Sequence, residues 1–156
     1  MITRRLFVGM ALLGLSACGS KVNSFVDDTY DPPLFPNETK ELRAQINYWA
    51  DHYQIPRTLV HRVIQRESSY RPEARNGPYY GLMQILPQTA RTMGHTGSAE
   101  DLLKADVNLQ YAGKYLRGAW LVSDGDEKTA VGWYARGYYY EAKRRGLLVE
   151  TGLRSA

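Results

Sequence analysis

The chain has 156 residues, of which 44% are hydrophobic and 23% charged, a composition that suits one globular domain with a single core and excludes two. Its net charge is +4, but the Lys and Arg residues are scattered apart from Lys143–Arg145, and no nucleic-acid-binding motif accompanies them. We therefore interpret that basic run as a solvated surface and expect no nucleic-acid partner.

The first residues have the pattern of an export signal. Met1 to Arg5 is a positive segment, and the apolar run from Leu6 to Leu15 is shorter than the roughly 20 residues of a stable bilayer span. The following Leu-Ser-Ala-Cys resembles the bacterial lipoprotein box, in which cleavage precedes the cysteine and its thiol receives a diacylglycerol. We predict a signal peptide over residues 1–17 and lipid attachment at Cys18. The alternative is an ordinary signal peptide with a coincidental cysteine.

Cys18 is the only cysteine, so the chain forms no internal disulfide. The resemblance implies a periplasmic protein that a lipid anchor holds to a membrane. Because Gly19 rather than aspartate follows the cysteine, it favours the outer membrane. Residues 18–36 predict a flexible tether, since three prolines exclude a regular helix there.

Residues 37–156 predict an all-α domain with at most a minor β-hairpin near residues 73–85, where Asn76-Gly77-Pro78 is a turn signal. Asn37 is the expected N-cap of a first helix that runs to Tyr53. Pro56 suits the first turn of a second helix that ends near Ser69. Further helices are expected over Gln88–Met93, Glu100–Leu103 with a cap at Ser98 and Asp101, Ala105–Val122, Lys128–Tyr134 and Tyr140–Arg145.

The second predicted helix carries a glutamate where an apolar residue is expected. Val60, Ile64 and Glu67 share one helix face because they are separated by four and three residues. Burial there would raise the pKa of Glu67, and a carboxylic acid that stays protonated near neutral pH can act as a general acid. The alternative is a glutamate at a fraying helix end that points to water or pairs with an arginine.

Four segments that begin at this glutamate resemble, in their order, the lytic transglycosylases with a lysozyme-like SLT-type domain: ESSYRPEA, YYGLMQILPQTA, NLQYAGKYL and AVGWYARGY. The resemblance runs from about Ile55 to Gly137. It implies a lysozyme-like helical fold and cleavage of the β-1,4 bond between N-acetylmuramic acid and N-acetylglucosamine in peptidoglycan, with a 1,6-anhydromuramoyl product. Glu67 falls on the catalytic glutamate of the family, which acts as general acid and then as base.

The other site residues follow from the same resemblance. Gly81, Met83 and Gln84 match the loop that lines the sugar groove, and Tyr134 matches a tyrosine near the catalytic acid. Spacing alone leaves Met83 and Tyr134 equally open to a place in the core. The remaining candidates for substrate contact are Ser68, for which capping of the helix end is the favoured alternative, Asn76, which stands where the family has a serine, and Tyr80, which can offer its face to a sugar ring.

The sequence departs from the family pattern after Tyr134. Ala135 stands where asparagine is usual, and Arg136 replaces a small residue. We therefore keep two alternatives: a non-catalytic lipoprotein that binds peptidoglycan, and a hydrolytic muramidase of the same fold. The expected partners are peptidoglycan strands and the membrane, with cell-wall or secretion machinery as further candidates. No cofactor and no metal are expected.

Overall fold

The computed structural model describes residues 30–155. The predicted signal peptide, the lipid attachment at Cys18 and most of the predicted tether lie outside these residues. Within residues 30–155, none of the helices combines the length and the apolar character that crossing a membrane requires.

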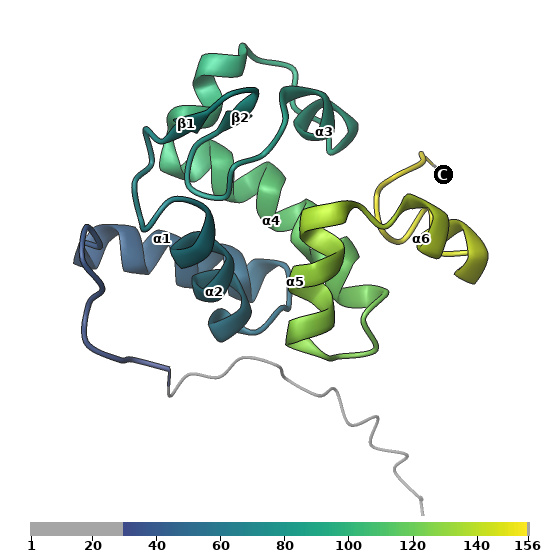
Figure 1. The fold of residues 1–156 in the computed structure, drawn as a ribbon, viewed down its shortest axis with the longest axis horizontal. Coiled ribbons are helices and arrows are strands. Elements are labelled where there is room, and N and C mark those ends of the chain that lie inside the picture. The colour runs from purple at the N-terminus through teal and green to yellow at the C-terminus, as the bar shows by residue number, and fades with distance from the viewer. Residues whose placement is uncertain (1–29, 156) are drawn as a thin grey trace, which may run out of the picture.

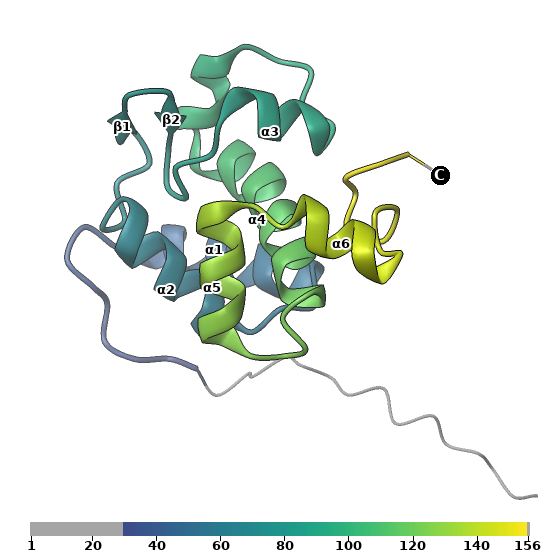
Figure 2. The same ribbon diagram turned by 45° about the vertical axis from the view of Figure 1, so that its right-hand side comes forward.

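The described residues confirm the predicted all-α fold with a minor hairpin. Figures 1 and 2 show the hairpin and α3 stacked above α1, α2 and α5, with α4 passing behind them. The α-helices are α1 (Lys40–His52), α2 (Arg57–Glu67), α3 (Pro87–Thr92), α4 (Ala105–Leu121), α5 (Glu127–Arg136) and α6 (Tyr139–Arg145), with a 3-10 helix, η1, over Ala99–Leu103.

Helix α4 is the centre of the packing. It contacts α1, α3, α5 and η1, so both layers of the domain meet on it. Its buried side includes Leu109, Leu116 and Ala119, each without exposed surface, and one polar residue, Asn108, that is equally buried. A buried polar side chain needs hydrogen-bond partners, so Asn108 must form hydrogen bonds to other buried groups of the domain.

The hairpin consists of β1 (Arg75–Asn76) and β2 (Tyr79–Tyr80), paired antiparallel around the predicted turn. A further antiparallel bridge joins Tyr80 to Ile85 through two backbone hydrogen bonds of 3.1 Å. The bridge closes residues 81–84 into a tight loop directly after the hairpin, which brings that loop beside the end of α2.

The first helix begins differently from the prediction. Its N-cap is Thr39, whose hydroxyl accepts the Leu42 amide at 3.1 Å, and not Asn37. Asn37 has φ +68°, and its side-chain amide donates to the Ser69 carbonyl at 3.1 Å. Asn37 was predicted wrongly because this long-range contact with the end of α2 competes with the local capping role.

Residues 30–38, which we call the N-terminal strap, lie against α1 and α2. A buried ion pair holds the strap: the Arg43 guanidinium donates to both Glu38 oxygens, with the Nη2–Oε2 distance 2.7 Å. The Glu38 side chain has no exposed surface, and Arg43 also donates to the Pro32 carbonyl at 3.0 Å. Because removing one partner of such a pair costs about 3–5 kcal/mol, the strap is an integral part of the domain.

The other element boundaries follow the sequence closely. Ser98 and Asp101 form the predicted capping box, although the segment that they open is a 3-10 helix. Helix α5 is longer at both ends than predicted, because the Asp126 carboxylate caps it by accepting the Thr129 amide at 2.7 Å and Gly137, at φ +87°, ends it.

Candidate active site

Glu67 is the last residue of α2, at the end of the apolar stripe that the sequence predicts. Val60, Val63 and Ile64 are buried in the core, whereas the Glu67 side chain is 23% exposed. The carboxyl group is therefore largely withdrawn from water but remains reachable. This placement excludes a freely solvated helix-end glutamate, whereas the pairing with an arginine that the alternative also named is present, since Arg66 Nε lies 3.5 Å from Oε1.

Two opposing effects act on the Glu67 carboxyl. Burial raises its pKa above the ordinary value, because the charged form loses hydration. The positive charge of Arg66, whose Nε lies 3.5 Å from Oε1, opposes this shift, but burial is the larger effect. The net raised pKa favours a protonated carboxyl, which is the form that a general acid requires.

The turn after Glu67 is strained. Ser69 and Tyr70 have φ values of +51° and +62°, in the left-handed region that costs a non-glycine residue of the order of 1 kcal/mol or more. The N-terminal strap supports this turn: the Phe35 ring stacks on that of Tyr70 with centroids 5.1 Å apart, and Asn37 bonds the Ser69 carbonyl. These contacts fix the direction in which the chain leaves Glu67.

The loop over residues 81–84 is built around the side chain of Asn108. Its Oδ1 accepts the Met83 amide at 2.9 Å, and its Nδ2 donates to the carbonyls of Tyr80 and Leu102, each at 2.8 Å. One buried amide thus joins α4 to the loop, to β2 and to η1. All three of these hydrogen bonds are buried, so they hold the loop in one position.

Glycine is required at position 81 for two reasons. Its φ is +75°, and a Cβ there would lie 2.2 Å from the Leu102 carbonyl oxygen and 2.3 Å from Asn108 Nδ2. No side chain fits at these distances. The sequence-predicted loop glycine therefore serves the close approach of the loop to Asn108.

Tyr134 connects the loop to α5 and to Glu67. Its hydroxyl donates to the Met83 carbonyl at 2.7 Å, and the side chain is 8% exposed. Burial raises the phenol pKa well above its ordinary value, and the nearby charge of Glu67 raises it further. The hydroxyl therefore stays protonated beside the carboxyl group, and α5, α2 and the loop converge at this point.

A hollow of about 260 Å³ opens beside Tyr134, and Glu67 is not among the residues that line it. Gln84 and Tyr134 line it together with Tyr79, Ile85, Leu86, Thr89, Tyr115, Ala135, Arg136 and Gly137. Gln84 is 9% exposed and has φ +49°; its Nε2 donates to the carbonyls of Ala74 and Gly81, which fixes the orientation of the amide. Its Oε1 is a buried acceptor without a hydrogen-bond partner among the described residues.

The other predicted site residues have different surroundings. Ser68 is buried at the C-cap of α2, and its hydroxyl bonds the Ile64 carbonyl at 3.3 Å, which is the capping alternative. The Met83 side chain has no exposed surface, so its backbone is the part that takes part in the site. Tyr80 is buried under the Arg75 guanidinium, 4.5 Å from the ring centroid, and Asn76 is exposed in β1. Neither of these two lines the hollow.

Three contributors to this region were not among the predicted site residues. Tyr79, and not Tyr80, faces the hollow, because neighbouring strand residues point to opposite sides. Tyr115 lines the hollow from α4, and Asn108 positions the loop from the same helix. Both lie in the NLQYAGKYL segment, and a polar residue on the apolar stripe of a helix was the available signal for Asn108.

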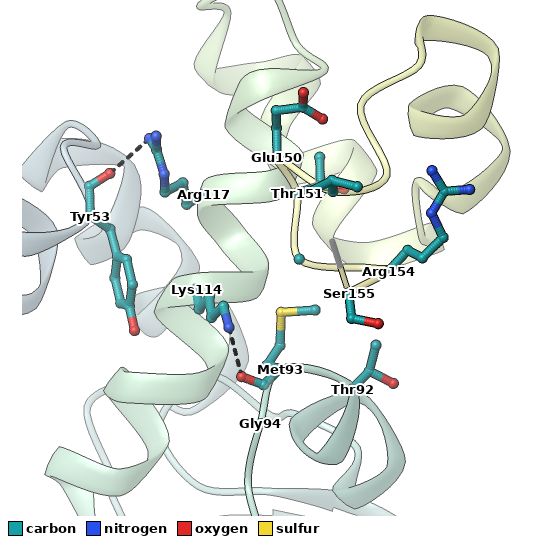
Figure 3. A pocket seen from close by; sticks show the side chains of 12 residues that line it. Tyr53, Thr92, Met93, Gly94, Lys114, Arg117, Glu150, Thr151, Arg154 and Ser155 are labelled. Carbon is teal, nitrogen blue, oxygen red and sulfur yellow. Dashed lines mark hydrogen bonds between the residues drawn. The ribbon is translucent and has the colours of Figure 1, made fainter.

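A second hollow, of about 450 Å³, lies away from these residues, between α4 and the segment 149–155 (Figure 3). Its Lys114 donates to the Met93 carbonyl at 2.9 Å, and Arg117 donates to the Tyr53 carbonyl at 3.1 Å. It contains none of the predicted site residues, and its one acidic residue, Glu150, is exposed. The larger volume therefore does not indicate the reactive centre. Over residues 30–155 no cluster of three His, Cys, Asp or Glu side chains is suited to hold a metal ion.

Comparison with known families gives one match. A family model described as "Transglycosylase SLT domain" matches residues 44–146, which include Glu67, the loop 81–84, Asn108 and Tyr134. No solved structure matches the chain.

The space around residue 81 gives a test of the loop. Gly81→Ala should lower the free energy of unfolding by several kcal/mol, because the new methyl group must displace Leu102 or Asn108 and the residue keeps a left-handed φ. Gly77→Ala is the matched control, since it has φ +58° but no atom within 4 Å of a Cβ, and should cost only about 1 kcal/mol. Urea unfolding of both variants measures the difference, and equal losses would show that the loop is not closely packed on α4.

Proposed function

Because the chain belongs to the SLT-domain family of lytic transglycosylases, which act on peptidoglycan, we propose that it is an active lytic transglycosylase with Glu67 as its catalytic residue. The observation that carries the proposal is the placement of Glu67, whose carboxyl ends a buried apolar stripe, keeps access to water and has a raised pKa. In this proposal the substrate is the glycan strand of peptidoglycan, bound along the hollow beside Tyr134.

Glu67 takes part in two successive proton transfers, giving one proton and then accepting a different one. Protonated Glu67 gives its proton to the glycosidic oxygen while the bond from that oxygen to C1 of N-acetylmuramic acid breaks. The C6 hydroxyl of the same sugar then attacks C1, and the Glu67 carboxylate accepts the hydroxyl proton. The new C6–O–C1 bond gives a 1,6-anhydro end, and Glu67 returns to its protonated state.

The charges around Glu67 support an internal nucleophile. Glycosidases that use water or a covalent intermediate place a second carboxylate about 5–10 Å from the acid. Over residues 30–155, burial and the charge of Arg66 account for the shift in the pKa of Glu67, and no carboxylate is among its causes. A substrate hydroxyl as nucleophile removes the need for that second carboxylate. In the proposed mechanism, the acetamido group of the substrate stabilises the positive charge that develops at C1.

Gln84 and Tyr134 have separate roles in the proposal. The unpartnered Oε1 of Gln84 is an acceptor for the N–H of an acetamido group on the glycan. Tyr134 holds the loop to α5 through its bond to Met83 and keeps an undissociated hydroxyl near Glu67. Binding of the sugar ring is thereby coupled to the position of the acid.

Replacement of the acid tests the proposal. Glu67→Gln should lower the rate of sacculus digestion by at least roughly a hundredfold, since general acid catalysis contributes about 10²–10⁴. Folding should be retained, because the raised pKa means that the fold already favours a neutral side chain. Glu73→Gln, at an exposed loop position, is the control and should stay near wild type.

Mass spectrometry of the digest distinguishes the alternatives. Anhydromuramoyl ends, lighter by one water than reducing ends, support the transglycosylase. Reducing ends would indicate a hydrolytic muramidase, and binding to sacculi without cleavage by the wild type would indicate a peptidoglycan-binding lipoprotein. Full digestion by Glu67→Gln would remove this residue from the reaction.

The pH profile gives a second test. Glu67 must be protonated to act as the acid, so kcat/KM falls as the pH rises through its pKa. Arg66 lowers this pKa, and Arg66→Gln should therefore raise it and move the alkaline limb to higher pH, most clearly at low ionic strength. Arg62→Gln, an exposed arginine on the same helix that pairs with Glu127, is the matched control. An alkaline limb that shifts equally in both variants, or in neither, contradicts the assignment.

We also propose, from the sequence pattern alone, that Cys18 carries a lipid that holds the domain in the periplasm, on the outer membrane. Cys18→Ser should move the protein from the membrane fraction to the soluble fraction, because the lipid is the proposed attachment. Fractionation together with fatty-acid labelling checks this, and a labelled Cys18→Ser variant would place the lipid elsewhere.

A further inference from the structure

Arg136 occupies the junction of two neighbouring hollows. It is the last residue of α5, and Figure 2 shows that this end of α5 lies on the side of the hairpin and α3. Arg136 and Gly137 line both the hollow beside Gln84 and a second one of about 410 Å³, which Trp133 and Tyr138 to Tyr140 also line. A strand that runs along both hollows therefore passes this side chain.

The Arg136 side chain is held in place by its own helix. Its guanidinium carbon lies 3.9 Å from the centroid of the Trp133 ring, a cation–π contact. A Cβ at position 132 would lie 3.0 Å from Arg136 Nη1, so Gly132 leaves room for the guanidinium to fold back along α5. The cation is therefore pre-positioned, which lowers the entropy that binding a ligand would cost.

The charge of Arg136 is not neutralised by the described residues. Over residues 30–155, no carboxylate forms an ion pair with it. The acid that shares the second hollow, Glu141, is held by Arg144 at 2.6 Å and by Arg145 at 2.5 Å. A guanidinium that is fixed and unpaired is suited to bind a carboxylate with two parallel hydrogen bonds.

A second observation points to a ligand in the same hollow. Gln84 is nine-tenths buried, and its Oε1 lacks a hydrogen-bond donor among the described residues. The hollow thus combines an acceptor for an N–H group with a cation for a carboxylate. A sugar that bears both groups satisfies both residues.

We propose that Arg136 binds a carboxylate on the lactyl side of N-acetylmuramic acid and so selects among peptidoglycan strands. The proposal rests on the proposed function, since it takes the glycan as the occupant of the hollow. Two sources have this chemistry: the lactyl carboxylate, which is free only where the peptide stem has been removed, and the carboxylates of an attached stem. Arg136 thereby becomes a specificity residue.

Three substrates separate these sources. Glycan strands with intact stems, strands freed of stems by an amidase, and stem-free strands whose carboxylates are converted to methylamides are digested by wild type and Arg136→Ala. We expect Arg136→Ala to raise KM by roughly threefold to tenfold on a carboxylate-bearing strand, with kcat nearly unchanged, and to leave the methylamide strand unaffected. An effect on stem-free strands alone identifies the lactyl carboxylate, and an effect on stem-bearing strands alone identifies the stem. Arg136→Lys should recover part of the affinity.

Arg91→Ala is the matched control, because it removes an exposed arginine of α3 that lines neither hollow. A loss that is equal on all three substrates, or equal in Arg91→Ala, overturns the proposal. Calorimetric binding of the same strands to Glu67→Gln separates this proposal from the proposed function. Charge-dependent binding without any turnover by the wild type would support the role of Arg136 and reject the lyase activity. Turnover without charge dependence would support the lyase activity and reject the role of Arg136.

Discussion

The buried side-chain amide of Asn108 is the interaction on which the arrangement of the site depends. It fills the inside of the loop 81–84 and uses both of its polar atoms on backbone groups of three separate segments. Leaving any of these groups unpaired in the core would cost about 1–3 kcal/mol, so the loop, η1 and β2 are tied to α4 as one unit. Gly81 makes the close approach possible, and Tyr134 fastens the other side of the loop to α5.

Three residues around this unit have strained backbone. Ser69 and Tyr70 follow the acid, and Gln84 ends the loop; all three have left-handed φ values without being glycine. Such residues persist only where surrounding contacts determine their conformation. The N-terminal strap provides those contacts on one side through Phe35 and Asn37, and the buried Glu38–Arg43 pair holds the strap itself. The segment that leads toward the predicted membrane anchor is thus packed directly on the turn that follows Glu67.

The electrostatic surroundings divide the charged groups between separate tasks. Glu67 is kept largely from water and pairs with Arg66 at 3.5 Å, while burial keeps the pKa of its carboxyl above the ordinary value. Arg136 stands on another helix, with its charge on the surface of the groove. Because α2 supplies Glu67 and α5 supplies Arg136, a substitution at position 136 need not alter the proposed acid.

Local sequence pattern was enough to predict the helical class, the hairpin turn, the capping box at Ser98 and the unusual place of Glu67, because periodicity and turn chemistry are local properties. Long-range packing explains why Thr39 and not Asn37 caps α1, why Tyr79 and not Tyr80 faces the hollow, and why Ser68 and the Met83 side chain are buried. It also assigned Asn108 to the loop. Each of these outcomes depends on a partner far away in the chain. The fold decides which group lies next to a buried polar side chain or against one face of a strand, and the local pattern carries no information about that partner.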